Sequence, residues 1–262
     1  MILFKHELKL NLKLIIIWSA CVGFSCFGCI LLFGGLKESM EKMADAYAQM
    51  GTFSSALGLD RMNVSTMEGF FATEVALIYA IGGAMFAAMT GVCMLSKEEE
   101  GHTSEFLNTL PLSRLQVLAA KYAALLCLVL LFGIVTLMFV LAGFACMGEL
   151  PHMENLLWYQ GAAFVMQLEI GSICFFLSAI CHKKPTGAAL GLTVFLYMLD
   201  LLLRVVPALK PAKYITPFYF ANAADIFAES AVNMPLLAGG ACACAVFFAA
   251  ALTLYGRRDI SG

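Results

Sequence analysis

Residues 96–121, SKEEEGHTSEFLNTLPLSRLQVLAAK, form one long charged segment between two strongly apolar stretches of the chain. Two pairs in this segment, Ser96 with Glu99 and Ser113 with Gln116, have the spacing of a capping box. In that motif each residue's side chain bonds to the backbone N–H of the other at the start of a helix. The segment therefore predicts two helix starts with a bend between them.

A short amphipathic turn is expected between the two predicted caps. Its apolar residues are Phe106, Leu107 and Leu110, and Pro111 ends it because the residue before a proline is disfavoured in the helical conformation. A surface helix with acidic residues beside it, held between two apolar stretches, suits docking onto a soluble partner. A solvated linker with a cap at each end has the same local pattern, so both interpretations stay open.

The composition places the chain in a membrane. Hydrophobic residues make up 61% of the sequence and charged residues 13%, whereas soluble domains carry about 25% charged residues. The formal net charge of −2 argues against a nucleic-acid partner, which requires a basic surface. The ten cysteines lie within or at the ends of apolar stretches, so we expect packing residues and no metal site.

Six apolar stretches are long enough to cross a bilayer as helices, since about 20 residues suffice. They occupy residues 14–36, 73–95, 117–147, 156–181, 186–206 and 234–255. Before them, residues 1–13 carry apolar side chains every fourth position with lysines around the other side, which is typical of an interfacial helix. The sequence predicts an all-α integral membrane protein, with residues 1–262 forming a single transmembrane domain.

The lysines and arginines predict the orientation. With a cytoplasmic N-terminus, most of them fall on the inner side, and the outer ones lie mainly in the two longest loops, where the positive-inside rule weakens. We expect a multi-pass protein of the cell membrane with both termini in the cytoplasm. The segment 96–121 then faces the cytoplasm as well.

The run EEEGHTSEFLNTLPLSR at residues 98–114, followed by Lys121 and Tyr122, resembles the cytoplasmic loop between the second and third spans of type-2 ABC-exporter permeases. The closing YGRRD at residues 255–259 resembles that family's C-terminus, and the six-span layout agrees with it. The resemblance implies that a short cytoplasmic coupling helix in this loop contacts a separate ABC ATPase subunit. Residues at or beside the contact would be Glu99, Gly101, Thr103, Glu105, Phe106, Leu107, Pro111 and Arg114.

Motifs for catalysis or nucleotide binding are absent from the sequence. No Gly-x-x-x-x-Gly-Lys-Ser/Thr pattern occurs, so we expect no cofactor on this chain and place ATP and Mg²⁺ on the partner ATPase. His6 and Glu7 begin like a zinc-protease motif, but Leu10 stands where a second histidine must bind the metal. We therefore expect no catalytic residue and a non-enzymatic transport subunit.

Ionisable residues inside apolar spans are costly and therefore often functional or paired. Glu169 lies near the middle of the fourth span, which also carries Gln160 and Gln167, and these three define a candidate translocation path. A protonated or hydrogen-bonded packing residue is the alternative for Glu169. Asp200 and Arg204 stand four residues apart, a spacing that predicts an ion pair on one helix face.

Two classes of function remain open. The chain is predicted to be the permease subunit of an ATP-driven exporter, working with an ABC ATPase, a second or homologous permease copy and membrane lipid. The alternative is an ion-gradient-driven secondary carrier, or an intramembrane enzyme, that uses Glu169. Dependence on an ATPase partner separates the two, and no residue pattern selects the cargo.

Overall fold

Every regular element among the described residues is a helix. The computed structural model describes residues 2–48, 51, 54, 59, 61–101, 113–181 and 183–257. Within them, six segments are long and apolar enough to cross a membrane: Leu12–Met40, Met67–Glu98, Arg114–Met147, Met153–Ile180, Thr186–Val205 and Met234–Tyr255. The predicted all-α architecture with six transmembrane helices is confirmed.

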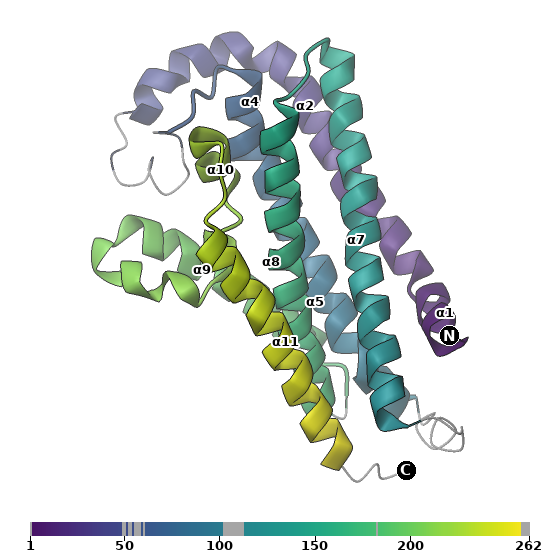
Figure 1. Cartoon of the computed structure of the whole chain (residues 1–262). Helices are drawn as coiled ribbons and strands as arrows, with labels where there is room; N and C mark the ends of the chain where they lie inside the picture. Colours follow the sequence, from purple (N-terminus) through teal and green to yellow (C-terminus); the bar gives the residue numbers. More distant parts are fainter. Residues whose placement is uncertain are drawn as a thin grey trace.

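The long helices form one bundle, and two of them lie at its centre (Figure 1). They are α2 (Leu12–Ala48), α5 (Ala76–Glu100), α7 (Arg114–Met147), α8 (Met153–Ile180), α9 (Thr186–Val205) and α11 (Met234–Arg257). The most apolar windows of the second and fourth spans are 67% and 61% buried, against 28% and 22% for the fifth and sixth. The centre of the bundle is therefore the α5–α8 pair, and α9 and α11 lie at its margin.

Small residues allow α5 and α8 to approach closely. A Cβ added to Gly91 of α5 would come within 2.3 Å of the backbone oxygen of Gly171 on α8. Helices inside a membrane gain stability from such close packing because lipid tails are as apolar as the side chains. The two glycines thus allow a close backbone contact at the centre of the bundle.

The helix α1 (Ile2–Leu10) packs beside the start of α7, at the end of the bundle where α5 and α11 finish (Figure 1). A helix in this part of the chain agrees with the periodicity of residues 1–13. Its position at a membrane interface stays a prediction, and the predicted coupling helix lies outside the described residues.

Short helical segments lie toward the other end of the bundle, where the first two of them form the first turns of the second span. They are α4 (Met67–Phe70), the π-helix η1 (Phe71–Val75), the 3₁₀ helices η2 (Pro207–Tyr214) and η3 (Pro217–Tyr219), and α10 (Ala223–Glu229). The helix α2 contains the predicted first span, continues without a break beyond residue 36 and bends over this end (Figure 1). The short helices after α9 hold a fold-back segment against α5 and α8.

One of the two predicted capping boxes is present. Ser113 Oγ accepts from Gln116 N at 3.2 Å, and Gln116 Oε1 accepts from Ser113 N at 3.0 Å, so α7 begins as predicted. The predicted cap at Ser96 is wrong, because α5 continues through it to Glu100. Ser96 Oγ instead donates to Val92 O at 2.7 Å inside the helix.

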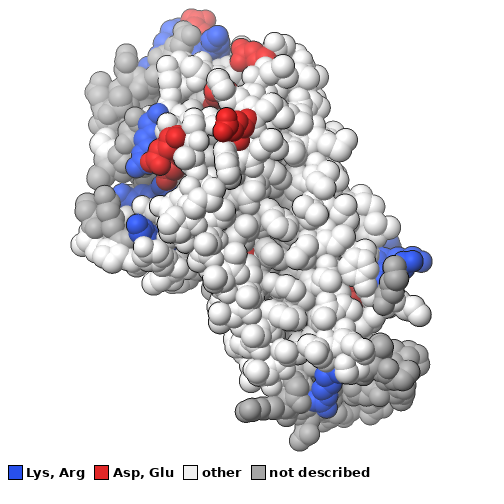
Figure 2. Space-filling model, in the orientation of Figure 1, with Lys and Arg blue, Asp and Glu red and all other residues white. Residues whose placement is uncertain are grey.

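Charged side chains gather toward the two ends of the molecule on the face shown in Figure 2. The broad zone between them is almost entirely uncharged, as a surface in contact with lipid tails must be. The end that carries α1 and the flanks of residues 102–112 is therefore one aqueous side of the protein. The end that carries the short helices is the other.

Candidate functional site

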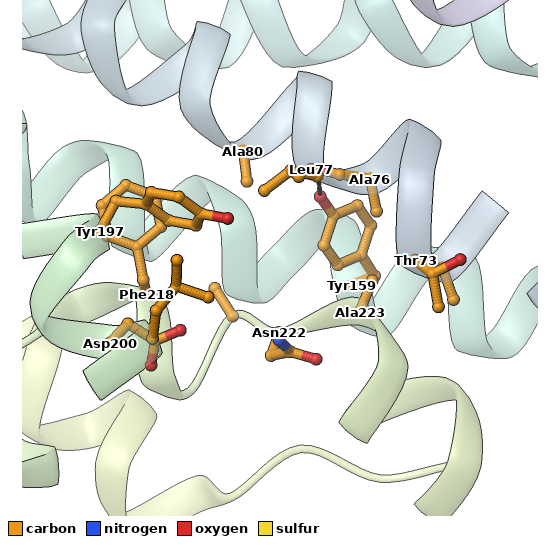
Figure 3. A pocket seen from close by; sticks show the side chains of 13 residues that line it. Thr73, Ala76, Leu77, Ala80, Tyr159, Tyr197, Asp200, Phe218, Asn222 and Ala223 are labelled. Carbon is orange, nitrogen blue, oxygen red and sulfur yellow. Dashed lines mark hydrogen bonds between the residues drawn. The ribbon is translucent and has the colours of Figure 1, made fainter. Parts of the chain in front are cut away.

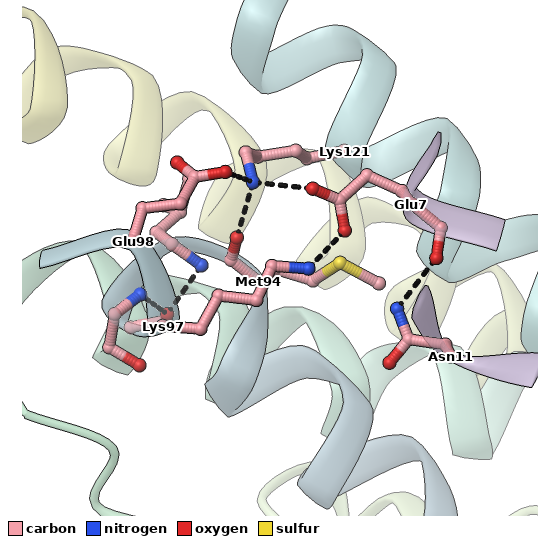
Figure 4. A network of polar contacts seen from close by, with 9 residues as sticks. Glu7, Asn11, Met94, Lys97, Glu98 and Lys121 are labelled. Atoms are coloured by element: carbon pink, nitrogen blue, oxygen red, sulfur yellow. Dashed lines mark hydrogen bonds and ion pairs between the residues drawn. The ribbon is translucent and has the colours of Figure 1, made fainter. Parts of the chain in front are cut away.

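Four charged side chains meet where α5 ends and α7 begins (Figure 4). Lys121 Nζ donates to Glu7 Oε1 at 2.7 Å, to the Met94 carbonyl at 2.8 Å, and to Glu98. Lys97 donates to the other carboxylate oxygen of Glu7. We call Glu7, Lys97, Glu98 and Lys121 the base network. It joins α1, α5 and α7 through charges that lie in three separate parts of the sequence.

The base network is largely shielded from water. Glu7 and Lys121 are both 0% exposed, and two lysines face two glutamates, so no net charge is buried. Burial by itself would raise the pKa of the Glu7 carboxyl, but Lys121 and Lys97 outweigh it and hold that pKa below its usual value. Glu7 is therefore ionised at neutral pH. Buried ions of this kind are tolerated only when each has its partners.

Further hydrogen bonds tie neighbouring helices together at the same end. The backbone N–H groups of Leu95 and Ser96 both donate to Ser178 Oγ, each at 2.9 Å, and so join α5 to α8. Arg114 Nη1 donates to the Tyr255 carbonyl at 3.1 Å and joins α7 to α11. The first residue of α7 is thus held by the last span.

The short segment that precedes α9 is also bonded to α5. The backbone N–H of Lys184 donates to Glu100 Oε2 at 3.2 Å, and the ammonium of Lys184 lies 3.6 Å from the same oxygen. Both flanks of residues 102–112 are therefore anchored in the bundle. These contacts connect the flanks to α1, α8, α9 and α11.

A second polar cluster lies in the middle of the bundle. Gln160 Nε2 donates to Tyr79 Oη at 2.7 Å and to the Gly133 carbonyl at 3.0 Å. Gln167, further along the same helix, is 0% exposed, and a Cβ on Gly83 would come within 2.2 Å of its Nε2. We call Tyr79, Gln160 and Gln167 the polar seam. It lies between α5, α7 and α8, inside a single copy of the chain.

Glu169 lies on a different face of α8. Two residues along a helix turn the side-chain direction by about 200°, so Glu169 points away from Gln167. It is 8% exposed, and a Cβ on Gly240 of α11 would come within 2.8 Å of its Oε2. Within the described parts of the chain that oxygen has no hydrogen-bond partner. The three residues of the candidate path therefore fall in two places, the polar seam and the α8–α11 contact.

A family model for the ABC-2 family transporter protein matches residues 1–260. The chain belongs to the ABC-2 transporter family. It is therefore a multi-pass membrane permease of an ABC transporter. The ABC-2 permeases are transport subunits, generally without catalytic activity, and the family implies an ABC ATPase partner and often a dimer. No curated protein matches the chain.

Some of the predicted ATPase-contacting residues of this ABC-2 permease lie beside the base network. Glu99 is in the last turn of α5, and the N–H of Gly101 donates to Lys97 O at 3.0 Å where the helix ends. Arg114 opens α7. The others lie outside the described residues: Thr103, Glu105, Phe106, Leu107 and Pro111.

The partners of Lys121 in this permease were not found from the sequence. Glu7 belongs to the stretch that begins like a zinc-protease motif, and Lys97 and Glu98 belong to the charged segment 96–121. A lysine inside an apolar stretch does signal that a carboxylate must lie nearby. The sequence gives no means of choosing Glu7, which lies 114 residues away along the chain.

Metal ligation has no support in the part of the ABC-2 permease that the structure describes. No group of three or more His, Cys, Asp or Glu residues there is placed to hold a metal ion. The ten cysteines are free thiols.

Proposed function

We propose that this ABC-2 permease is the membrane-spanning subunit of an ATP-driven exporter of the cell membrane. Residues 1–262 form one transmembrane domain, and both termini face the cytoplasm together with residues 102–112. A separate ATPase subunit, which binds the ATP and Mg²⁺, docks on those residues through Thr103, Glu105, Phe106, Leu107 and Pro111, flanked by Glu99, Gly101 and Arg114. This chain itself needs no cofactor.

The observation that carries this proposal is the base network. A motor can move a permease only if its contact segment is firmly connected to the spanning helices. Glu98 ties the end of α5 to Lys121 of α7, and Lys121 in turn ties both to α1 through Glu7. Arg114 adds the link to α11. A push on residues 102–112 would thus shift several helices together.

We propose that the cargo path follows α8, with Glu169 supplying a polar group on the α11 side and Gln160 and Gln167 supplying polar groups in the polar seam inside the bundle. The unpaired Oε2 of Glu169 beside Gly240 supports a role for that carboxylate at the path. The last span, α11, packs against α8 but is largely exposed, with only 22% of its most apolar window buried. A second or homologous permease copy binds on this side and completes the path.

The docking segment is tested by capture of the cognate ABC ATPase on purified permease. Glu105→Lys and Leu107→Asp should each lower capture about tenfold, since an interface residue of this kind contributes on the order of 1–2 kcal/mol. Glu149→Lys and Leu150→Asp make the same chemical changes at exposed positions of the opposite end and should leave capture unchanged. Unchanged capture by the Glu105 and Leu107 variants, with membrane insertion intact, would contradict the proposal.

A proton-coupled carrier is the second candidate, because a buried carboxylate oxygen without a partner is suited to taking up a proton. It is distinguished by transport in vesicles that contain the permease and a proton gradient but no ATPase subunit. Transport under those conditions that is lost in Glu169→Gln favours the carrier. Transport only with the ATPase and ATP favours the exporter.

A further inference from the structure

A cavity of about 50 Å³ lies between α5, α8, α9 and the fold-back segment, at the end opposite the base network (Figure 3). Its polar and aromatic walls are formed by Thr73, Tyr159, Tyr197, Asp200, Phe218 and Asn222. Because about 10–15 Å³ of such volume holds one water molecule, the cavity accommodates a group of a few heavy atoms. This is the size of a small amine, and the cavity lies away from the base network.

Asp200 brings an unsatisfied carboxylate oxygen to this cavity. The residue is 3% exposed, and its Oδ2 accepts from Arg204 Nε at 3.0 Å. Its Oδ1 has no hydrogen-bond partner among the residues that the structure describes, and Figure 3 shows a carboxylate oxygen directed toward the cavity. A buried charged acceptor without a donor is costly, so a ligand that donates to it gains the corresponding free energy.

The neighbouring arginines are already engaged. Arg204 Nη1 donates to Asp225 Oδ2 at 2.8 Å, and Arg61 donates to the other oxygen of Asp225. Both carboxylate oxygens of Asp225 and one of Asp200 therefore have guanidinium donors. The remaining oxygen, Asp200 Oδ1, has no such donor among the described residues, and Asp200 is one of the residues that line the cavity.

A further carboxylate lies near the cavity. Asp200 and Asp225 are balanced by Arg61 and Arg204, but Glu74 adds a third carboxylate. Glu74 follows the cavity residue Thr73 in sequence, and it is close enough to interact electrostatically with Tyr197 of the cavity wall. Among the residues described, Glu74 has no ion-pair partner. The unpaired Asp200 Oδ1, with a further carboxylate near the wall, favours a guest that donates hydrogen bonds over an anion.

Aromatic rings complete the walls. Tyr197 and Phe218 lie edge to face with their centroids 5.5 Å apart, and Tyr159 lines the α8 side. The faces of such rings attract ammonium groups, more strongly when the site is shielded from water. A carboxylate with a free oxygen beside several rings is a combination suited to a small organic cation.

We propose that this cavity binds a primary ammonium group, with Asp200 Oδ1 as its counter-ion and the rings of Tyr197 and Phe218 around it. The amine belongs either to the cargo or to the ethanolamine headgroup of a lipid, since both present the same cation. Its role in choosing cargo rests on the proposed exporter function. Binding itself does not, because it is measured on the permease alone.

The test uses purified permease, without an ATPase, in phosphatidylcholine nanodiscs. Thermal unfolding is followed while ethylammonium chloride is added, with sodium chloride at equal ionic strength and ethanol as comparison solutes. The melting temperature Tm should rise with ethylammonium and with neither comparison solute. Asp200→Asn should weaken the apparent affinity about tenfold or more, the value of one charge-assisted hydrogen bond.

A matched variant separates the site from the surrounding charges. Asp225→Asn removes the neighbouring carboxylate, whose oxygens are both paired to arginines, and should retain binding of ethylammonium. Should Asp200→Asn fail to fold, Ala80→Val fills the cavity from α5 without changing any charge and should abolish the stabilisation.

The source of the amine is decided by exchanging the lipid. If phosphatidylethanolamine raises the Tm of the wild type and ethylammonium adds nothing further, the ligand is the lipid headgroup. If ethylammonium still adds to the Tm, the ligand is a soluble amine, and either result supports the site. Equal stabilisation by ethanol, or no stabilisation by ethylammonium in any lipid, would overturn it and leave a water-filled cavity.

Discussion

Replacing Lys121 by methionine tests the base network most directly. Methionine keeps most of the length and apolar volume of the lysine stem but removes the ammonium. Glu7 and Glu98 then lose a donor in a region where Glu7 is 0% exposed. Lys97 alone cannot balance both carboxylates. The permease should therefore lose stability because a buried charge is left without its partner.

The size of the loss follows from burial. Removing one member of a buried ion pair costs about 3–5 kcal/mol. At about 2–4 °C per kcal/mol, the Tm should fall by about 6–20 °C. Lys184→Met is the matched control, since the side chains of Lys184 and Glu100 are 38% and 44% exposed and their pair is 3.6 Å long. An exposed pair of this kind contributes about 0–1 kcal/mol.

Thermal unfolding of the purified variants in nanodiscs measures the difference. A double variant, Lys121→Met with Glu7→Gln, leaves one lysine, Lys97, and one glutamate, Glu98, and so restores the charge balance of the base network. Its Tm loss should be smaller than the sum of the two single losses, because residues in one network are coupled. A Lys121→Met variant as stable as Lys184→Met, or additive losses in the double variant, would refute the assigned role of the base network.

Two further outcomes are expected. Gly91→Ala should lower the Tm because its Cβ would meet the backbone oxygen of Gly171 at 2.3 Å, whereas Gly161→Ala, with nothing within 4 Å, should leave it unchanged or raise it; equal effects would contradict the close α5–α8 contact. The lowered pKa of Glu7 stabilises the fold above the unfolded-state value of about 4.3, and this contribution is lost as pH falls through the folded-state pKa. Wild-type Tm should therefore drop more steeply on acidification than that of Glu7→Gln, and parallel pH profiles would argue against the ionised pair.

The coupling proposal gains a physical route from the same contacts. The N-terminal helix α1 is not an independent anchor. Glu7 pairs with Lys97 of α5, which precedes residues 102–112, and with Lys121 of α7, which follows them. Under the proposed coupling, a nucleotide-driven movement of those residues would reach α1 and the spanning helices together. The base network is the connection that the proposal assigns to such a movement.

Local patterns predicted local contacts well. The Ser113–Gln116 capping box and the Asp200–Arg204 pair both formed, the latter with Arg204 Nε 3.0 Å from Asp200 Oδ2. Each depends on residues three or four positions apart, whose relative placement a helix fixes by itself. Ser96 failed as a helix cap because α5 continues through it, and its N–H is paired with Ser178, 82 residues away.

The sequence by itself determined that the chain is helical, crosses the membrane six times and carries a polar segment between its second and third spans. Those properties follow from apolar length and local charge, which each stretch carries alone. Only the tertiary structure decided that Glu7 pairs with Lys121, and that Glu169 faces α11 while Gln167 lies in the polar seam. The physical reason is that the rotation of each helix about its axis is set by how its neighbours pack, and a buried charge takes whichever partner that packing brings within reach.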